Sequence, residues 1–192
     1  MLSLPTIVPF FRPIYYIGKT MSISIRLALT TDAREIAKVH IASWQAAYRD
    51  YLSDETLDHL SLDEFTKQWR DWLHEGKLLW VAEQGGHIIG FCSLCATRDP
   101  DHNQNDVAEI STIYLLQAFW GKHIGKKLCQ TALAYAKEQD FKHITLWVLE
   151  HNEPAQHFYK KMGFTQTRAR KIVHIGTDVL HLIRYTIMNE TH

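Results

Sequence analysis

The stretch "VAEISTIYLLQAFWGKHIGKKLCQTALAYA", residues 107–136, decides the fold class. Apolar and polar residues alternate through 107–116, which is typical of a β-strand. Residues 121–139 then carry apolar side chains at helical spacing, namely Ile124, Leu128, Ala132 and Tyr135. The sequence therefore predicts a strand that runs through a short loop directly into a helix.

The start of this helix is a candidate anion site. A helix N-terminus leaves backbone N–H groups unpaired and carries a partial positive charge. Gly121 and Gly125 allow a ligand to approach the backbone closely, and lysines add charge at 122, 126 and 127. The spacing is not that of a nucleotide P-loop, which disfavours ATP. An ordinary turn with packing glycines is the alternative reading of this stretch alone.

Further elements are predicted on both sides of this stretch. Strands are expected at 23–29, 77–84, 87–95, 143–150, 165–174 and 179–187. One long helix is expected to follow Asp32, which we expect to be its N-cap and to form a capping box with Glu35. Two more helices are expected at 54–75 and within 152–163. The order β-α-α-β-β-β-α-β-α-β-β predicts an α/β (α+β) domain with a mixed sheet.

Composition narrows the class of protein. The chain has 192 residues, 46% of them hydrophobic, which suits one globular domain. Lys plus Arg equals Asp plus Glu, at 21 each, so no broad charge indicates a nucleic-acid partner. Cys92, Cys95 and Cys129 are too few for a four-cysteine zinc site, so we expect buried cytoplasmic thiols and no metal.

The N-terminal segment differs from the rest of the chain. Residues 1–20 are apolar and contain three prolines, without the basic start of a signal peptide or the length of a membrane span. Regular patterning begins after Met21. We expect 1–20 to be an appendage, either an upstream start or a partner-binding arm, and 21–192 to form a single domain. We expect a cytoplasmic location without membrane attachment.

Residues 108–150, from "AEISTIYLL" through "ITLWVLE", followed by "NEPAQHFYKKMGF" at 152–164, resemble the GCN5-related N-acetyltransferase (GNAT) family, and the likeness covers roughly 23–187. It implies a mixed, splayed sheet of about seven strands and acetyl-CoA as cosubstrate. The family's loop [QR]-x-x-G-x-[GA] binds the cofactor's pyrophosphate. Here it spans 120–125, where only Gly125 matches, because Trp120 and His123 replace the usual residues.

The resemblance also implies the residues that hold the cofactor. Backbone groups of Ile113, Tyr114 and Leu115 would pair with the pantetheine arm, and Asn152 would hydrogen-bond it. The pyrophosphate would lie on the backbone of the loop, which comprises Gly121, Lys122, His123, Ile124, Gly125 and Lys126. From the residues alone, Asn152 and Tyr159 could instead be a helix cap and a core aromatic.

Two residues are implied as catalytic. Tyr159 would donate a proton to the leaving thiolate, and Glu109 would accept the proton of the amine. The alternative base is Asp106, and a chain of water molecules could replace either carboxylate. A solvated acid on an alternating strand is the structural alternative for Glu109.

The acceptor is the least determined part of the expected reaction. Aromatic and acidic residues are expected around the acceptor site: Trp44, Tyr48, Tyr51, Asp50, Asp54, Glu55, Asp58, Asp99, Asp101 and Asp106. These residues favour a small cationic amine over a protein N-terminus or lysine. A homodimer is compatible with the sequence. A non-catalytic acyl-CoA-binding regulator on the same fold is the alternative function.

Overall fold

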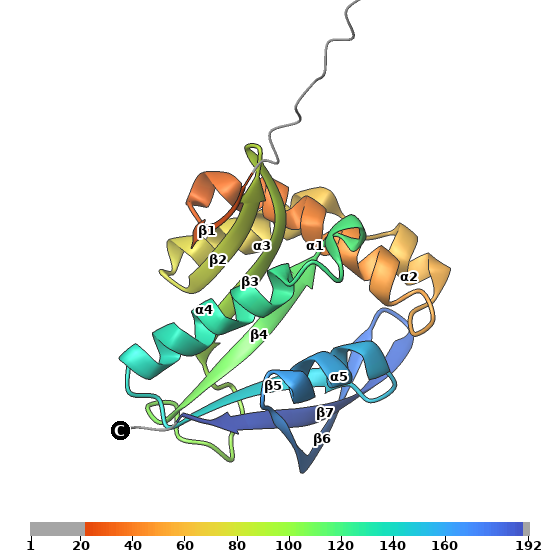
Figure 1. The fold of residues 1–192 in the computed structure, drawn as a ribbon. Helices are drawn as coiled ribbons and strands as arrows, with labels where there is room; N and C mark the ends of the chain where they lie inside the picture. Colours follow the sequence, from red (N-terminus) through yellow and green to blue (C-terminus); the bar gives the residue numbers. More distant parts are fainter. Residues whose placement is uncertain (1–21, 190–192) are drawn as a thin grey trace, which may run out of the picture.

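The computed structural model describes residues 22–189 (Figure 1). The predicted appendage, residues 1–20, lies outside this range. The strands are β1 (Ile23–Leu27), β2 (Leu78–Gln84), β3 (His87–Ala96), β4 (Val107–Leu115), β5 (His143–Leu149), β6 (Thr165–Ile175) and β7 (Asp178–Met188). The α-helices are α1 (Ala33–Ala47), α2 (Asp54–Asp58), α3 (Leu62–His74), α4 (Ile124–Glu138) and α5 (Glu153–Lys161), with short 3-10 turns at Thr30–Asp32 and Gln117–Phe119.

The seven strands form one mixed sheet in the order β1-β2-β3-β4-β5-β7-β6, which confirms the predicted fold class. All neighbouring strands are antiparallel except β4 and β5. This parallel pair is joined only at Val107–His143, Ala108–Ile144 and Glu109–Thr145. Beyond Glu109 the two strands diverge, and Figure 1 shows β4 rising away from β5.

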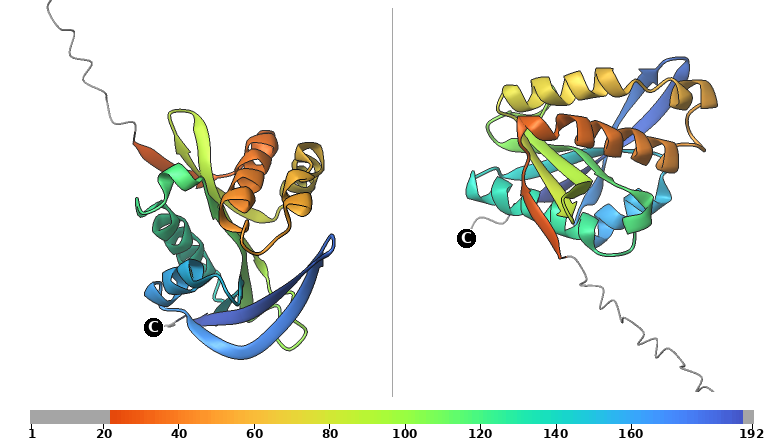
Figure 2. Two further views of the ribbon diagram at one scale, coloured as in Figure 1. Left: turned by 90° about the vertical axis from the view of Figure 1, so that its right-hand side faces the viewer. Right: turned by 90° about the horizontal axis from the view of Figure 1, so that it is seen from above.

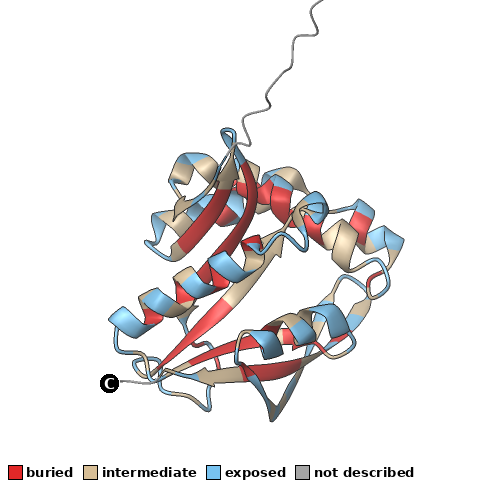
Figure 3. Cartoon of the chain, viewed as in Figure 1, coloured by how far each residue is buried: buried red, intermediate tan, exposed pale blue. Residues whose placement is uncertain are grey.

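Helices cover both faces of the sheet (Figure 2). Helices α1 and α3 pack on one face, around a core that includes Ile36, Trp69 and Phe91. Helices α4 and α5 pack on the other face, around a larger core that includes Leu128 and Tyr185. Figure 3 shows the buried stretches of β3, β4 and β5 between these layers. We call the two faces the α1 face and the α4 face.

Strand β4 is irregular where it leaves β5. Its pairing with β3 shifts between Ser93 and Leu94, so that Ser111 is an extra residue on β4. The Ser93 hydroxyl lies 2.7 Å from the Ser111 hydroxyl and 2.5 Å from that of Thr112. A bulge of this kind bends and twists the strand that carries it. The bulge therefore contributes to the divergence of β4 from β5.

Two helix predictions require correction. The helix expected over 54–75 is two helices, because the side chains of Ser53 and Ser61 each cap a separate start, accepting N–H bonds from Thr56 and Glu64. The capping box expected of Asp32 with Glu35 was also wrong. The Asp32 carboxylate instead accepts the Leu29 N–H and pairs with Arg26 at 2.7 Å.

Substitution of Gly90 by alanine should destabilise the fold. A Cβ atom there would lie 2.9 Å from the Tyr114 carbonyl oxygen and 2.6 Å from Leu115 Cδ1. The carbonyl belongs to backbone, so β3 and β4 would have to separate locally. We expect Gly90→Ala to lower the free energy of unfolding by about 1–3 kcal/mol in urea titrations.

Gly125→Ala is the matched control, because its Cβ would meet only Phe158 carbons at 3.8 Å. We expect this variant to be unchanged or more stable by up to about 1 kcal/mol. Equal stabilities of the two variants would contradict the close approach of β3 to β4.

Candidate functional site

The divergence of β4 from β5 leaves backbone groups of β4 without a strand partner. The Leu116 N–H donates to the Ile89 carbonyl on β3 at 2.9 Å. Since successive residues of a strand direct their N–H and C=O groups to opposite sides, Leu115 and Ile113 direct theirs away from β3. We call this open edge, between Ile113 and Leu115, the β4 notch. Tyr114 directs its backbone to β3, where it pairs with Phe91.

Trp120 already uses one group of the β4 notch. Its indole Nε1 donates a hydrogen bond to the Leu115 carbonyl oxygen at 2.8 Å, while 45% of the residue stays exposed. This contact joins the loop that follows β4 to the end of the strand. The unusual tryptophan therefore holds the loop in place and occupies an acceptor that a bound ligand could use.

The loop before α4 keeps a left-handed residue at the position of the family's missing glycine. His123 has φ 61° and ψ 8°, and it is the N-cap residue of α4. Gly121 is also left-handed, with φ 73°. A left-handed conformation strains a residue that carries a Cβ, although histidine tolerates it better than most. These two residues explain why α4 begins at Ile124 and not at 121.

The first turn of α4 has backbone N–H groups that are not paired within the helix. The first helical bond runs from the Lys127 N–H to the His123 carbonyl at 3.1 Å, so the preceding N–H groups have no partner within the helix. Lys126 is exposed beside them, and Lys122 Nζ lies 5.1 Å from the centre of the Phe119 ring. This end of α4 thus combines free N–H groups with positive charge.

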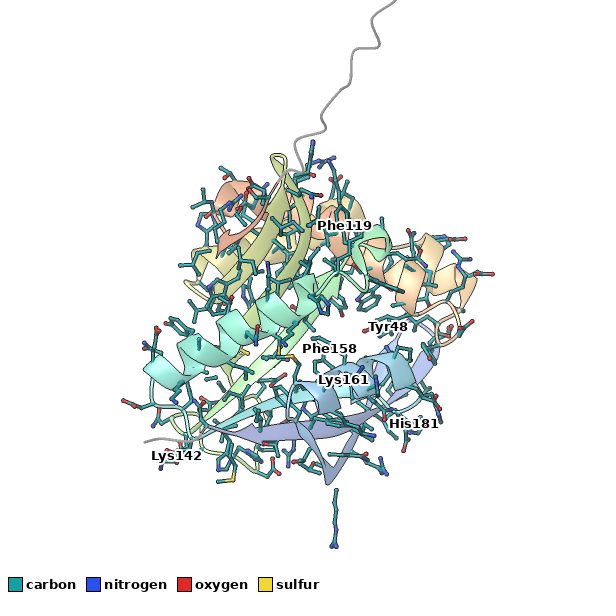
Figure 4. All side chains as sticks on the ribbon, in the orientation of Figure 1. Tyr48, Phe119, Lys142, Phe158, Lys161 and His181 are labelled. Carbon is teal, nitrogen blue, oxygen red and sulfur yellow. The ribbon has the colours of Figure 1, made fainter. Side chains whose placement is uncertain are left out.

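Tyr159 lies on α5, in the core of the α4 face. It is 8% exposed, and its ring contacts Phe158 and Phe164 edge-on at 5.2 Å and 5.9 Å between ring centroids. Burial raises the pKa of Tyr159 well above that of an ordinary phenol. The hydroxyl therefore stays protonated at neutral pH and can act as a hydrogen-bond donor. Figure 4 shows Phe158 on α5 and Tyr48 at the end of α1, both near this region.

Asn152 is a helix cap in the structure. It precedes α5, and its side-chain oxygen accepts a hydrogen bond from the Ala155 N–H at 3.1 Å. The side-chain amide nitrogen has no hydrogen-bond partner within residues 22–189. Capping and cofactor binding are therefore compatible, because they use different atoms of the same side chain.

Glu109 lies on the α1 face at the last pairing between β4 and β5. Only 2% of the residue is exposed. Arg98 Nη2 contacts its Oε1 at 2.5 Å, and the Arg98 N–H groups approach its Oε2 at 3.3 Å and 3.4 Å. Glu109 is therefore buried in an ion pair, and it can accept a further proton only through a lone pair that Arg98 leaves free.

A second charged cluster lies beside Glu109 on the α1 face. Trp147 Nε1 donates to both oxygens of Asp99 at 3.1 Å, and Arg184 contacts the same carboxylate at 3.1 Å. Arg184 also binds Asp101 at 2.7 Å, which lowers the pKa of Asp101 to about 2. Lys171 Nζ lies 4.2 Å from the centre of the Trp147 ring.

The end of α1 and the β6–β7 turn form the rim of this face. Trp44 Nε1 donates to the Tyr114 hydroxyl at 2.8 Å, and Tyr48 packs against Trp44 at 5.5 Å between ring centroids. Asp178, at the start of β7, accepts hydrogen bonds from the N–H and hydroxyl of Ser53 and from the Thr56 hydroxyl. Helix α2 is thereby joined to the β6–β7 hairpin.

Most of the acids expected around the acceptor are neutralised within the chain. Asp54 pairs with Arg49 at 3.2 Å, and Asp106 pairs with Lys142 at 2.8 Å. Asp99 and Asp101 share Arg184. Asp50, Glu55 and Asp58 have no ion pair within residues 22–189. The negative charge open to a ligand is therefore smaller than the sequence indicated.

Sequence reasoning missed the cations that lie among the acids of the α1 face. Arg98, Arg184 and Lys171 lie on three separate segments, and only the register of β5, β6 and β7 brings the last two beside Trp147. No motif in the sequence links them. The alternation in β6, where Ala169, Lys171 and Val173 share one face, was the one available signal.

Comparison with known proteins agrees with this geometry. Residues 42–164 match the family model described as Acetyltransferase (GNAT) family. The uncharacterized N-acetyltransferase YuaI of Bacillus subtilis is 27% identical over 72% of this chain and 78% of its own length. A second Bacillus subtilis relative, a candidate ribosomal protein bS18-alanine N-acetyltransferase, is 28% identical over 71% of this chain and 92% of its own length.

Solved structures share the fold. A Salmonella typhimurium protein solved with acetyl-CoA superimposes with a TM-score of 0.67, at 20% identity, over 89% of this chain and 96% of its own. Within residues 22–189 no helix is long and apolar enough to cross a membrane. The roles of the individual site residues remain predictions. The match over residues 42–164 makes this chain a member of the GNAT acetyltransferase family, an N-acetyltransferase that uses acetyl-CoA.

Proposed function

We propose that the chain transfers an acetyl group from acetyl-CoA directly to a primary amine, with Glu109 as base and Tyr159 as acid. The observation that carries this proposal is the β4 notch, an open strand edge with the buried carboxylate of Glu109 on the same strand. Glu109 is on the α1 face, and Tyr159 comes from α5 on the α4 face. An amine and a proton donor can therefore approach a thioester in the notch from opposite sides.

The cofactor would bind as an extra strand. The open N–H and C=O groups of Ile113 and the N–H of Leu115 are available to the pantetheine amides. The Asn152 amide can add a hydrogen bond from the other side of the notch. The pyrophosphate would lie on the backbone from Gly121 to Lys126, at the positive end of α4. This mode needs no side chain from His123, which explains how the loop tolerates its departure from the family pattern.

The reaction then needs two proton transfers. A primary amine with a pKa near ~10.4 is mostly protonated at neutral pH, so a base must remove its proton before attack. Glu109 lies nearer the divergence of β4 and β5 than the alternative base Asp106. Glu109 makes the last pairing between the two strands, with Thr145, whereas Asp106 precedes β4. Tyr159 would protonate the sulfur as the C–S bond breaks.

For the acceptor, we propose a small cationic amine that enters between α1 and the β6–β7 hairpin. Support comes from the aromatic rings of Trp44 and Tyr48, which can hold an ammonium group, and from the unpaired acids Asp50, Glu55 and Asp58. A protein N-terminal amine is the second candidate. It is favoured by the second Bacillus subtilis relative, whose name specifies an alanine of a ribosomal protein.

CoA fragments should separate the two halves of the cofactor site. If the α4 end binds the pyrophosphate, dephospho-CoA should bind nearly as well as CoA, and pantetheine should bind much more weakly. Acetyl-CoA at a hundredfold excess over its Kd should stabilise the fold by about 2.7 kcal/mol. Calorimetry would measure the affinities. Equal affinities for pantetheine and CoA would show that the α4 end is not a phosphate site.

Trp120 and His123 should affect binding in different ways. Trp120→Phe keeps the ring but frees the Leu115 carbonyl, so we expect CoA and pantetheine both to bind roughly twofold to tenfold more tightly, the range of one net hydrogen bond. His123→Gly relieves the left-handed strain of the loop and should tighten CoA binding only. Calorimetry on the two single variants and on Trp120→Gln with His123→Gly checks this. Unchanged or weaker CoA binding would show that these side chains contact the ligand themselves.

Tyr159→Phe should lower kcat by about 10²-fold or more, with little change in CoA affinity, because only the donated proton is lost. Tyr185→Phe is the matched control. Tyr185 is also buried on the α4 face, but its hydroxyl already donates to side-chain oxygens of Gln156 and Gln166, at 3.3 Å and 3.5 Å. Wild-type turnover in Tyr159→Phe would remove the proposed acid.

Glu109→Gln should lower turnover most near neutral pH and recover partly at high pH, where the amine loses its proton without help. The pH–rate profile with the best amine acceptor measures this. Glu83→Gln, which removes another ion-paired carboxylate on β2, should follow the wild-type profile. A Glu109→Gln deficit that is the same at every pH would exclude Glu109 as the base.

A further inference from the structure

Lys171 lies on the acceptor side of the sheet. It is on β6 opposite Leu182, which is in turn opposite Leu149 on β5. Leu149 and Leu182 pack with the end of α1 and with α2, so Lys171 is on the α1 face. Its ammonium group reaches across β7 to the ring of Trp147. This is the face on which Glu109 lies and from which we propose that the amine enters.

Lys171 differs from the other lysines of the structure in its burial. Among residues 22–189 it is the one lysine that is not exposed, and it has no ion pair within that range. The ten others are exposed at 38, 67, 77, 122, 126, 127, 137, 142, 160 and 161. Trp147, which supports Lys171, is fixed by its hydrogen bonds to Asp99. The amine is therefore held in place on the acceptor face without a carboxylate of its own.

We propose that Lys171 is an internal acetyl acceptor, so that the enzyme acetylates its own Lys171 from bound acetyl-CoA when no other amine is present. The inference rests on the proposed function, because it uses the same cofactor position and the same two catalytic groups. It adds a modification site on the chain itself.

The electrostatic surroundings favour the reactive form of this amine. Burial lowers the pKa of Lys171 below its usual 10.5, and Arg98 and Arg184 act in the same direction, while Glu109 and Asp99 oppose them. A lower pKa means that a larger fraction of the side chain is the free amine that can attack a carbonyl. The nearby carboxylate of Glu109 can take the proton that the nitrogen loses.

The chemical step balances without a further reactant. The Nζ lone pair attacks the thioester carbonyl carbon and forms a C–N bond, and the C–S bond breaks. The proton from the nitrogen passes to Glu109, and Tyr159 protonates the leaving thiolate. The products are CoA and a neutral acetyl-lysine, which can no longer make the cation–π contact with Trp147.

The test is to incubate the full chain with acetyl-CoA in the absence of any amine and to follow acetylation by intact and peptide mass spectrometry. We expect one acetyl group per chain, on Lys171, with a rate constant that does not change over a tenfold range of protein concentration. Lys171→Arg should abolish this product. Tyr159→Phe should slow it by about 10²-fold, as expected for loss of the acid.

Lys77→Arg is the matched control, since Lys77 Nζ also lies over a tryptophan, at 4.6 Å from the Trp72 ring, but is exposed. It should leave the labelling of Lys171 unchanged. Similar labelling of Lys77 and Lys171, or labelling that Tyr159→Phe does not slow, would indicate chemical acetylation and overturn the inference.

An amine panel in the same preparation separates the internal acceptor from the proposed function. Turnover of added amine with Lys171 unlabelled overturns only the internal acceptor, whereas no acetyl transfer at all overturns the proposed function as well.

Discussion

The short contact between β4 and β5 is the constraint on which the rest of the site depends. Three residue pairs hold β4 and β5, the one parallel pair of strands within residues 22–189, together, and the two strands diverge after Glu109. A buried strand edge must satisfy its N–H and C=O groups. Because β5 no longer pairs with β4 beyond Glu109, the groups of Ile113 and Leu115 are left for a ligand or for the Trp120 indole. The bulge at Ser111 bends β4, and the loop that starts α4 follows the end of the same strand.

The two faces of the sheet have different chemical characters around this opening. The α4 face is apolar, and its burial keeps the Tyr159 hydroxyl protonated. The α1 face carries paired charges, in which Arg98 and Arg184 neutralise Glu109, Asp99 and Asp101. Buried charges are tolerated only when they are paired and hydrogen-bonded. This pairing explains why a face rich in acids is not strongly negative.

Local pattern was sufficient to predict the order of the strands along the chain, since each strand is a contiguous segment. It also led to the candidate site residues on β4, at the start of α4 and on α5, whose roles stay predictions. Local pattern was insufficient to predict contacts between residues that are far apart in the sequence. The sequence did not show that the acids on the α1 face are ion-paired. Their partners Arg98, Arg184 and Lys142 are distant in the sequence from the acids they bind, and the fold brings them together. The break between α2 and α3 was missed because apolar spacing continued through 54–75, although the Ser61 cap was present in the sequence. Asn152 showed that a cap and a candidate ligand contact can be the same residue.

Backbone amide hydrogen exchange at the β4 notch tests the central claim most directly. The account predicts that acetyl-CoA slows exchange at the amides of Ile113 and Leu115 and at those in the first turn of α4. The Tyr114 amide, which already faces β3, should change little, so it serves as an internal reference. Saturation with acetyl-CoA that leaves Ile113 and Leu115 exchanging as in the free protein would contradict the account, because the cofactor would then bind elsewhere than along β4.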